Sequence, residues 1–189
     1  MLIYIHGFRS SPLSFKSQLL AERMATAGLA SEYACPQLPD SPQAAIDMIR
    51  ETYLLAPGDT LVGSSLGGYY TSWLAEKTGC RAVLLNPAVN PARDLEPYVG
   101  ELRTYHTDQP MTFKAEYLDE LKTLDTPVIS SPERYFLIAA KGDELLDWRE
   151  MVDRYPDVRT KLLDAGDHGL SDFAEHIDEV LAFAGLGHV

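Results

Sequence analysis

The sequence predicts an α/β fold with a mainly parallel sheet of about six strands, covered by helices on both faces. Short apolar runs alternate with amphipathic segments along the 189 residues. Most of these runs are continuously apolar, which is typical of strands buried on both faces of a parallel sheet. In chain order they are "LIYI" (2–5), "SEYACP" (31–36), "TLVGS" (60–64), "RAVLLNP" (81–87), "RYFLIAA" (134–140) and "VRTKLLD" (158–164).

Helical signals fill the segments between these strands. Residues 13–28 place apolar side chains on one helical face, and Gly28 ends that helix. Proline is favoured at the first helical position, so Ser41-Pro42 opens the next helix, which runs through Ala56. Further helices are expected at 66–78, before Gly79, and at 112–124, 144–154 and 171–184.

One segment departs from the alternation. Residues 88–131 are rich in proline and hold only one clear helix. Parallel α/β sheets bind ligands at the carboxyl ends of their strands. We therefore expect one α/β domain over residues 1–189, in which 88–131 forms a lid or insertion over that edge.

The charge and the cysteines exclude several classes of protein. A formal net charge of −12 disfavours nucleic acid and anionic membranes as partners. Cys35 and Cys80 fit neither a disulfide framework nor a metal-ligand spacing. The opening "MLIYIHGF" is unlike a signal peptide, and no apolar run is long enough to span a membrane. We expect a cytoplasmic protein; its oligomeric state is not indicated.

The stretch "GSSLGG" (63–68) lies where a strand passes directly into a helix. Gly63-x-Ser65-x-Gly67 fits the GxSxG pattern of a nucleophile elbow, in which a sharp turn raises the serine above the sheet. Glycine is needed on either side because a Cβ would clash with neighbouring backbone. The alternatives are a turn without chemistry and a phosphate-binding loop, but no GK[ST] follows. We predict Ser65 as the nucleophile.

A serine nucleophile needs a base, and the order of the chain favours His168 among five histidines. His168 follows the last strand, in a loop that Gly166 and Gly169 allow to bend. The other candidates are less suitable: His6 precedes the serine and is expected to orient its own loop, His106 lies in the proposed lid, His176 in the last helix and His188 near the chain end.

The acid that orients the base is expected after the strand 134–140. Asp143 lies at the end of that strand and is the first candidate; a helix cap is its alternative role. Asp147 is the second candidate, and Glu144 is expected to point elsewhere. Asp164 and Asp167 are interpreted as turn formers.

Two backbone N–H groups are expected to form an oxyanion hole. One belongs to Leu66, directly after the serine, and the other to Phe8 in the "HGF" turn after the first strand. The aromatic and apolar residues Tyr69, Met111 and Phe113 could line a modest apolar substrate pocket suited to short acyl chains, or could simply be packed. The cations Arg93, Arg103, Lys114 and Lys122 could meet an anionic leaving group, or could be scattered surface charges.

The motifs "IYIHGFRSSPLSFK", "LVGSSLGGYY", "LLNPAVNP", "GDELLDW" and "GDHGLSDF", in this order, resemble the YqiA-type family of small bacterial esterases in the α/β-hydrolase superfamily. The resemblance covers nearly the whole chain. It implies hydrolysis of a small-molecule acyl ester or thioester without a cofactor or metal. It also implies a Ser–Asp–His triad, which falls on Ser65, Asp143 and His168. A non-catalytic binding protein on the same scaffold, an acyltransferase and a C–C hydrolase are the alternative functions.

Overall fold

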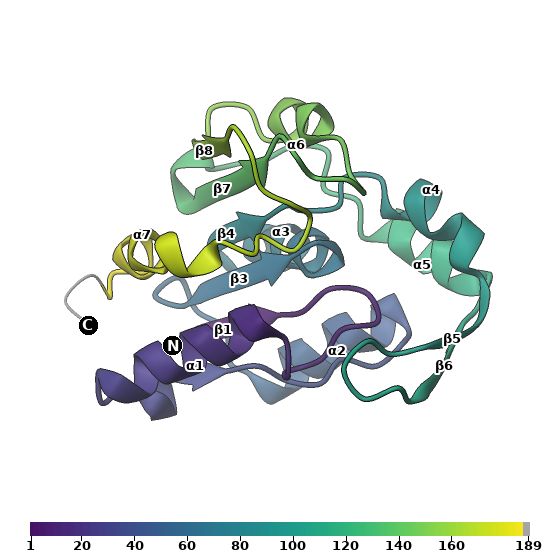
Figure 1. The fold of residues 1–189 in the computed structure, drawn as a ribbon, viewed down its shortest axis with the longest axis horizontal. Coiled ribbons are helices and arrows are strands. Elements are labelled where there is room, and N and C mark those ends of the chain that lie inside the picture. The colour runs from purple at the N-terminus through teal and green to yellow at the C-terminus, as the bar shows by residue number, and fades with distance from the viewer. Residues whose placement is uncertain (187–189) are drawn as a thin grey trace.

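The computed structural model describes residues 1–186, and six parallel strands form its main sheet in the order β2-β1-β3-β4-β7-β8. The sheet lies at the centre of the molecule, with helices on both sides (Figure 1). The predicted parallel α/β architecture is therefore confirmed. The strands are β1 (Leu2–Ile5), β2 (Tyr33–Ala34), β3 (Thr60–Ser64), β4 (Arg81–Leu85), β7 (Tyr135–Ala140) and β8 (Arg159–Leu163).

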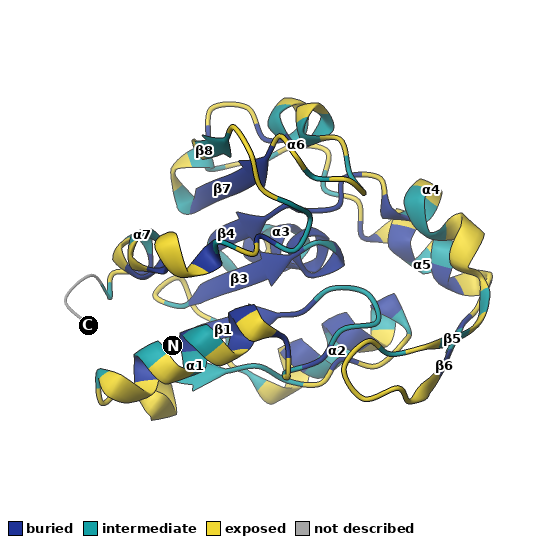
Figure 2. Cartoon of the chain, viewed as in Figure 1, coloured by how far each residue is buried: buried dark blue, intermediate teal, exposed yellow. Residues whose placement is uncertain are grey.

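Alternating side chains of the strands form the core on the two faces of the sheet. On one face Leu2 and Tyr4 pack with the helices α1 (Phe15–Thr26) and α7 (Ile177–Phe183). On the other face Ile3 and Ile5 pack with α2 (Pro42–Thr52) and α3 (Leu66–Thr78), and the β7 side of that face is covered by α6 (Trp148–Arg154). The inner strands β1, β3 and β7 are buried along their whole length, and β4 is buried after its first residue (Figure 2), as their apolar sequence predicts.

Residues 88–131 contain more structure than the sequence predicts. They form α4 (Pro91–Leu95), an antiparallel hairpin of β5 (Gly100–Arg103) and β6 (Pro110–Phe113), and α5 (Glu116–Thr123). The helix expected at 112–124 is thus shorter, because its first residues pair with β5. These elements gather beside the carboxyl ends of the sheet strands (Figure 1), and α5 packs against α2 and α4.

Several predicted element ends are also corrected. The helix expected to reach Ala56 ends at Thr52, before an extended stretch. The helix expected from residue 144 begins at Trp148, because the Asp147 side chain caps it by accepting the Arg149 N–H. The helix expected over 171–184 is divided into a 3-10 turn, Phe173–Glu175, and α7. Three further 3-10 turns are Ala30–Glu32, Glu96–Tyr98 and Pro132–Arg134.

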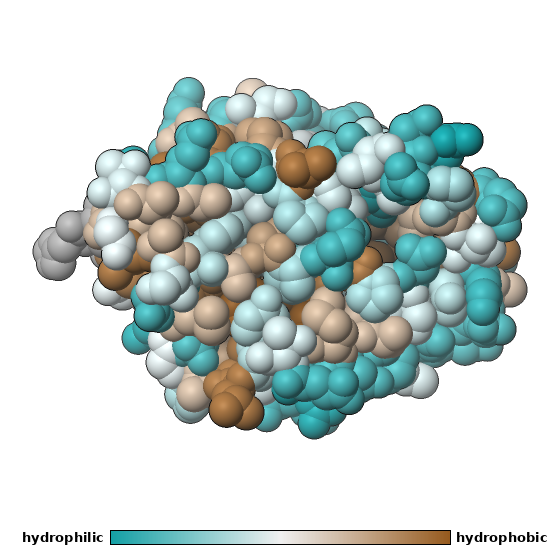
Figure 3. All heavy atoms as spheres, turned by 90° about the horizontal axis from the view of Figure 1, so that it is seen from below, coloured by the Kyte–Doolittle hydropathy of each residue, from teal (hydrophilic) through white to brown (hydrophobic). Residues whose placement is uncertain are grey.

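The surface mixes polar and apolar residues. On the face shown in Figure 3, hydrophobic residues are interspersed with hydrophilic ones and do not form a continuous band. Within residues 1–186, no helix combines the length and the apolar character that a membrane span requires.

Candidate active site

Loops at the carboxyl ends of three sheet strands bring Ser65, Asp143 and His168 together. Ser65 follows β3, Asp143 follows β7 and His168 lies beyond the end of β8. All strands of this sheet are parallel, so these ends meet at one edge. Residues separated by more than a hundred positions in the sequence become neighbours there, as the hydrogen bond between Ser65 and His168 shows.

The backbone at Ser65 forms the tight turn that the glycines of "GSSLGG" predict. Ser65 has φ 55° and ψ −122°, a conformation that costs an ordinary L-residue energy, and it precedes the first turn of α3. A Cβ on Gly67 would lie 2.0 Å from the Ile5 carbonyl oxygen, and one on Gly63 would lie 2.3 Å from the Gly67 carbonyl oxygen. The absence of these two side chains lets β1, β3 and α3 approach closely, and the turn raises the Ser65 hydroxyl.

Two hydrogen bonds join the three side chains. His168 Nε2 lies 3.0 Å from Ser65 Oγ, and His168 Nδ1 lies 2.8 Å from Asp143 Oδ2. The Asp143 side chain is fully buried and that of His168 is 16% exposed. A carboxylate that accepts from Nδ1 leaves the unprotonated Nε2 facing the serine, which is the tautomer that removes a proton from a hydroxyl.

The loop after β7 holds the Asp143 carboxylate in this orientation. Asp143 Oδ1 accepts the N–H groups of Leu145 and Leu146, both at 2.9 Å, so Asp143 caps a turn and contacts the imidazole at once. Asp147, the second candidate acid, instead caps α6, with its side chain half exposed. The structure therefore brings Asp143, and not Asp147, to His168.

The side chain of Glu144 lies in the site, contrary to the sequence-based expectation. Its Oε2 accepts the backbone N–H of His168 at 2.9 Å and so ties the loop after β7 to the loop after β8. The expectation was wrong because residue 144 lies in this loop rather than in the first turn of a helix. The charge of Glu144 alone gave no signal for this contact.

Asn86 is the supporting residue that the sequence analysis missed. It follows β4, is fully buried and has a left-handed φ of 41°. Its amide nitrogen donates to the carbonyl oxygens of Asp167 and His168, at 2.9 and 3.1 Å, and its amide oxygen accepts the Ala140 N–H at 2.8 Å. The sequence signal that could have indicated Asn86 is an asparagine directly after a buried strand, because asparagine is favoured in left-handed turns.

The loop after β1 forms the other side of the site. His6 is buried: its Nδ1 lies 3.0 Å from the Gly7 carbonyl, and its Nε2 accepts the Leu38 N–H at 3.1 Å. Burial lowers the pKa of His6, which agrees with a neutral ring that orients this loop. A Cβ on Gly7 would lie 3.2 Å from that of Ser65, so the loop passes directly beside the serine.

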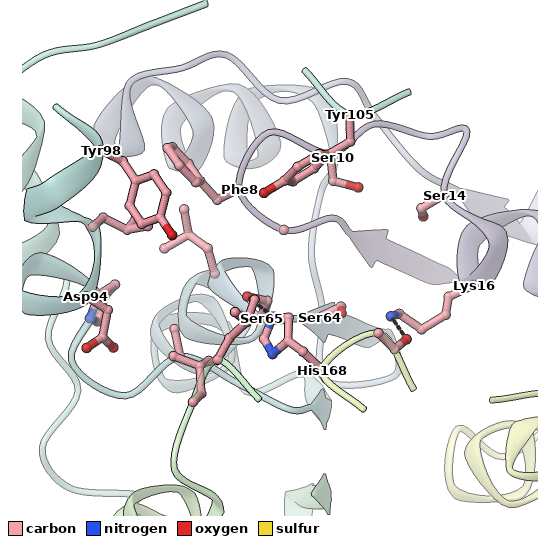
Figure 4. A pocket seen from close by; sticks show the side chains of 18 of the residues that line it. Phe8, Ser10, Ser14, Lys16, Ser64, Ser65, Asp94, Tyr98, Tyr105 and His168 are labelled. Atoms are coloured by element: carbon pink, nitrogen blue, oxygen red, sulfur yellow. Dashed lines mark hydrogen bonds between the residues drawn. The ribbon is translucent and has the colours of Figure 1, made fainter. Parts of the chain in front are cut away.

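A cavity of about 410 Å³ opens above Ser65 and His168 (Figure 4). Phe8 and Leu66, whose N–H groups are the predicted oxyanion donors, both line it. The segment 88–131 supplies much of one wall, and the loops after β1, β7 and β8, the turn at Ser65 and the start of α1 supply the rest. The wall residues of that segment are Ala88, Pro91, Asp94, Leu95, Tyr98, Tyr105 and His106.

The predicted substrate-binding residues Tyr69, Met111 and Phe113 do not line this cavity. The Tyr69 hydroxyl donates to the Leu121 carbonyl at 2.7 Å, which directs the ring into the core. Phe113 is buried and packs edge-on against Phe8, with ring centroids 5.0 Å apart, and so supports the cavity from behind. Met111 is also buried, beside the outer face of the Phe8 loop.

The remaining candidate bases and cations also lie away from the centre of the site. His106 lines the cavity rim, where its Nδ1 lies 3.2 Å from Ser11 Oγ, and His176 contacts Asp172; His188 is outside the described residues. None of the four cations of residues 88–131 lines the cavity, and each is paired with an acidic side chain: Arg93, Arg103, Lys114 and Lys122.

The candidate metal ligands of residues 1–186 are their His, Cys, Asp and Glu side chains. In the part of the chain that the structure describes, no three His, Cys, Asp or Glu side chains are grouped as metal ligands. The two cysteines are free thiols, and burial raises the pKa of Cys35 to about 11. The chemistry that the arrangement can perform is proton transfer from a serine hydroxyl to an imidazole, followed by attack of that oxygen on an acyl carbon.

Comparisons with known proteins agree with the fold. The family model described as "Uncharacterised protein family (UPF0227)" matches residues 1–185. Mouse α/β hydrolase domain-containing protein 10 superposes with a TM-score of 0.69 at 16% identity, over 96% of this chain and 89% of its own. Est1E of Butyrivibrio proteoclasticus, solved with ferulic acid bound, superposes with a TM-score of 0.66 at 13% identity, over 98% of this chain and 86% of its own. An esterase domain of a Rhodothermus marinus protein superposes with a TM-score of 0.63 at 18% identity, over 98% of this chain and 84% of its own.

Proposed function

Since the chain belongs to the family described as UPF0227 and has the α/β-hydrolase fold, we propose that it is a serine hydrolase that cleaves carboxylic esters and acyl thioesters. Ser65 is the nucleophile, His168 the general base and acid, and Asp143 the residue that orients His168. The substrate is a small molecule, and the reaction needs no cofactor.

The observation that carries this proposal is the pair of hydrogen bonds that runs from Ser65 through His168 to Asp143, at 3.0 and 2.8 Å. Packing alone would not require this arrangement, because Ser65 occupies a strained turn and both Ser65 and His168 line a cavity. An adjacent base activates the serine, which is otherwise a weak nucleophile.

In the first half of the reaction, His168 Nε2 takes the proton of Ser65 Oγ as that oxygen bonds to the acyl carbon. The N–H groups of Leu66 and Phe8 hold the negative oxygen of the tetrahedral intermediate. The bond to the alcohol or thiol then breaks, and the proton on His168 goes to the leaving atom. Asp143 stabilises the imidazolium while it exists.

In the second half, water takes the place of the alcohol. His168 removes a proton from that water as it attacks the acyl-serine, and the proton returns to Ser65 when the acid is released. The open cavity beside His168 admits this water. The same residues therefore serve both halves, and no further group has to titrate.

Residues 88–131 are proposed as the specificity-setting lid. They supply aromatic and apolar wall residues such as Leu95 and Tyr98, next to Leu66 and Phe8. A cavity of about 410 Å³ with this lining is suited to short acyl groups. Est1E, which was solved with ferulic acid bound, is a neighbour in fold only, so that acid does not identify the substrate here.

A fluorophosphonate probe and a series of p-nitrophenyl esters and acyl thioesters test the proposal. Wild type is expected to be labelled at Ser65 and to hydrolyse the short-chain members of the series. Ser65→Ala should lose both properties. Ser64→Ala is the matched control and should still be labelled, because Ser64 makes no hydrogen bond to His168 among the described residues. Folded wild type that is neither labelled nor active would favour a non-catalytic binding protein.

A further inference from the structure

Lys16 is a buried cation that lines the cavity and that the proposed mechanism does not use. It lies in the first turn of α1 and is only 6% exposed. Its Nζ donates to the carbonyl oxygen of Gly169, the residue after His168 (Figure 4). Burial lowers the pKa of Lys16 to about 8, so the side chain carries its charge at neutral pH.

The ammonium group of Lys16 has more donors than acceptors around it. An ammonium has three N–H donors, and the Gly169 carbonyl is the only hydrogen-bond acceptor that Lys16 has among the described residues. Its Nζ also lies 5.2 Å from the centroid of the Phe15 ring. Donors that are removed from bulk water and lack acceptors are costly, so the cavity side of Lys16 favours an acceptor from outside the chain.

The nearest carboxylates do not fill this role. Asp143 and Asp167 act on Lys16 through their charge, but neither forms a hydrogen bond with it in the described chain. The oxygens of Asp143 are engaged by His168 and by two backbone N–H groups. Those of Asp167 are engaged by the Ser171 N–H and hydroxyl. The carboxylate oxygens of both acids are therefore already hydrogen-bonded within the loops after β7 and β8.

Ser14 provides an independent observation at the same place. It is the N-cap of α1, where serine usually accepts a backbone N–H, yet its side chain makes no such bond. Its Oγ is buried and makes no hydrogen bond of good geometry among the described residues, although the Tyr4 hydroxyl interacts with it; the residue is 8% exposed and lines the cavity. A hydroxyl with spare hydrogen-bonding capacity and an undersatisfied ammonium thus line the same cavity.

The position of this pair identifies which part of a substrate it would meet. In Figure 4, Ser14 and Lys16 lie on one side of Ser65 and His168, whereas Phe8, Tyr98 and Asp94 lie on the other. His168 must protonate the leaving atom, so the leaving group lies on the His168 side. Lys16 is bonded to the residue next to His168, and it therefore belongs to the leaving-group side.

We propose that Lys16 and Ser14 form a subsite for a carboxylate on the leaving group. The preferred substrates are then esters in which the hydroxyl group of a hydroxy acid is acylated and its carboxylate is free. The inference rests on the proposed function, since it assigns the substrate class of that site. One ammonium and one hydroxyl match a monoanion, and no arginine of the described residues lines the cavity to hold a dianion such as phosphate. The acyl group occupies the opposite, more apolar side.

The test compares 3- and 4-acetoxybenzoate with the corresponding acetoxybenzamides, which have the same shape without the charge. Hydrolysis breaks the acetyl–oxygen bond, transfers acetyl to Ser65 and releases the hydroxybenzoate with the proton from His168. Wild type is expected to favour at least one benzoate over its amide by about 10- to 100-fold in kcat/KM, the effect of a hydrogen bond to a charged group. Lys16→Met should abolish that preference, so that the ratio of the benzoate to the amide kcat/KM falls to about one.

Matched variants separate recognition from a merely structural role. Lys16→Arg should retain the preference for the benzoate, and Ser14→Ala should reduce it. Lys122→Met removes a charge at an exposed position outside the cavity and should change nothing. A wild type without preference, or an equal loss on benzoate and amide in Lys16→Met, would overturn the inference and leave Lys16 as a support for the Gly169 carbonyl.

A binding measurement distinguishes failure of the subsite from failure of the proposed function. Titration of Ser65→Ala with 4-hydroxybenzoate and 3-hydroxybenzoate by calorimetry needs no turnover. Binding that disappears when Lys16→Met is added supports the subsite even if no ester is hydrolysed. Absence of binding to Ser65→Ala, when wild type hydrolyses esters and is labelled at Ser65, rejects the subsite and retains the hydrolase.

Discussion

The side-chain amide of Asn86 donates to the backbone carbonyl of His168, with 3.1 Å between the nitrogen and the oxygen. The same side chain accepts the Ala140 N–H at the end of β7. One buried asparagine therefore fixes the loop of the proposed base relative to the strand that leads to the proposed acid. The distance between His168 and Asp143 depends on this connection.

Asn86→Ala is expected to lower both stability and activity. It removes the side-chain partner of the Ala140 N–H and of the His168 carbonyl, and one of the two donors to the Asp167 carbonyl, which keeps the Leu170 N–H; the cost is about 1–3 kcal/mol in the free energy of unfolding. It also loosens the His168 loop, so kcat should fall. Urea unfolding and ester kinetics on the same preparation check this, with the exposed Asn90→Ala as control. Full stability in Asn86→Ala would show that the network is dispensable.

The variants Asp143→Asn and Asp147→Asn should differ sharply in kcat. Asp143→Asn removes the acceptor of the His168 Nδ1–H and favours the wrong tautomer, so kcat should fall by about 10⁴-fold. Asp147→Asn keeps a side chain that can cap α6, so its rate should stay close to that of wild type. Steady-state kinetics on one p-nitrophenyl ester measure both. An inactive Asp147→Asn with an active Asp143→Asn would reverse the assignment.

Gly67 should not tolerate even one methyl group. A Cβ there would meet the Ile5 carbonyl oxygen at 2.0 Å, a backbone atom of the central sheet, so β1 or α3 would have to move. Gly67→Ala is expected to cost about 1–3 kcal/mol or more in unfolding free energy and to abolish labelling of Ser65. At Gly58 a Cβ meets nothing within 4 Å, so Gly58→Ala is the control and should remain stable and active.

The sheet and the turn at Ser65 could be predicted because both depend on short-range patterns. Continuous apolar runs reveal buried strands, and the glycines of "GSSLGG" reveal a turn that excludes side chains. The order of Ser65, Asp143 and His168 along the chain then placed them at the same sheet edge, and the structure joins these three side chains.

The cavity wall could not be predicted in the same way. Tyr69 and Phe113 are aromatic and close in sequence to proposed functional segments, yet their rings are buried behind the wall. Whether such a ring faces a cavity or the core depends on how residues 88–131 pack on the sheet, which local periodicity does not contain. Lys16 was missed for a related reason: a lysine on a surface helix is normally exposed, and only the tertiary fold shows that this one is buried.

The burial of Lys16 should make the stability of the protein depend on pH in a way that Lys16→Met removes. The folded-state pKa is lowered to about 8 from an ordinary value of 10.5, chiefly by desolvation, while charges on Asp167 and Asp143 oppose the shift. Below about pH 8 the native protein holds a costly charge that the unfolded chain carries without cost. Between about pH 8 and 10.5 the unfolded chain binds more protons at this site, so this contribution to stability rises with pH.

At pH 7, Lys16→Met is therefore expected to be more stable than wild type, by about 2 kcal/mol once the lost bond to Gly169 is subtracted from the cost of the buried charge. The advantage should shrink as the pH rises from 8 toward 10, because wild-type Lys16 then becomes neutral in the folded state. Urea unfolding of both proteins at pH 7, 8, 9 and 10 measures the difference directly. A cation that weakens the fold is expected where its charge serves a ligand. A variant that is less stable at pH 7, or a gap that does not change with pH, would contradict this explanation of Lys16.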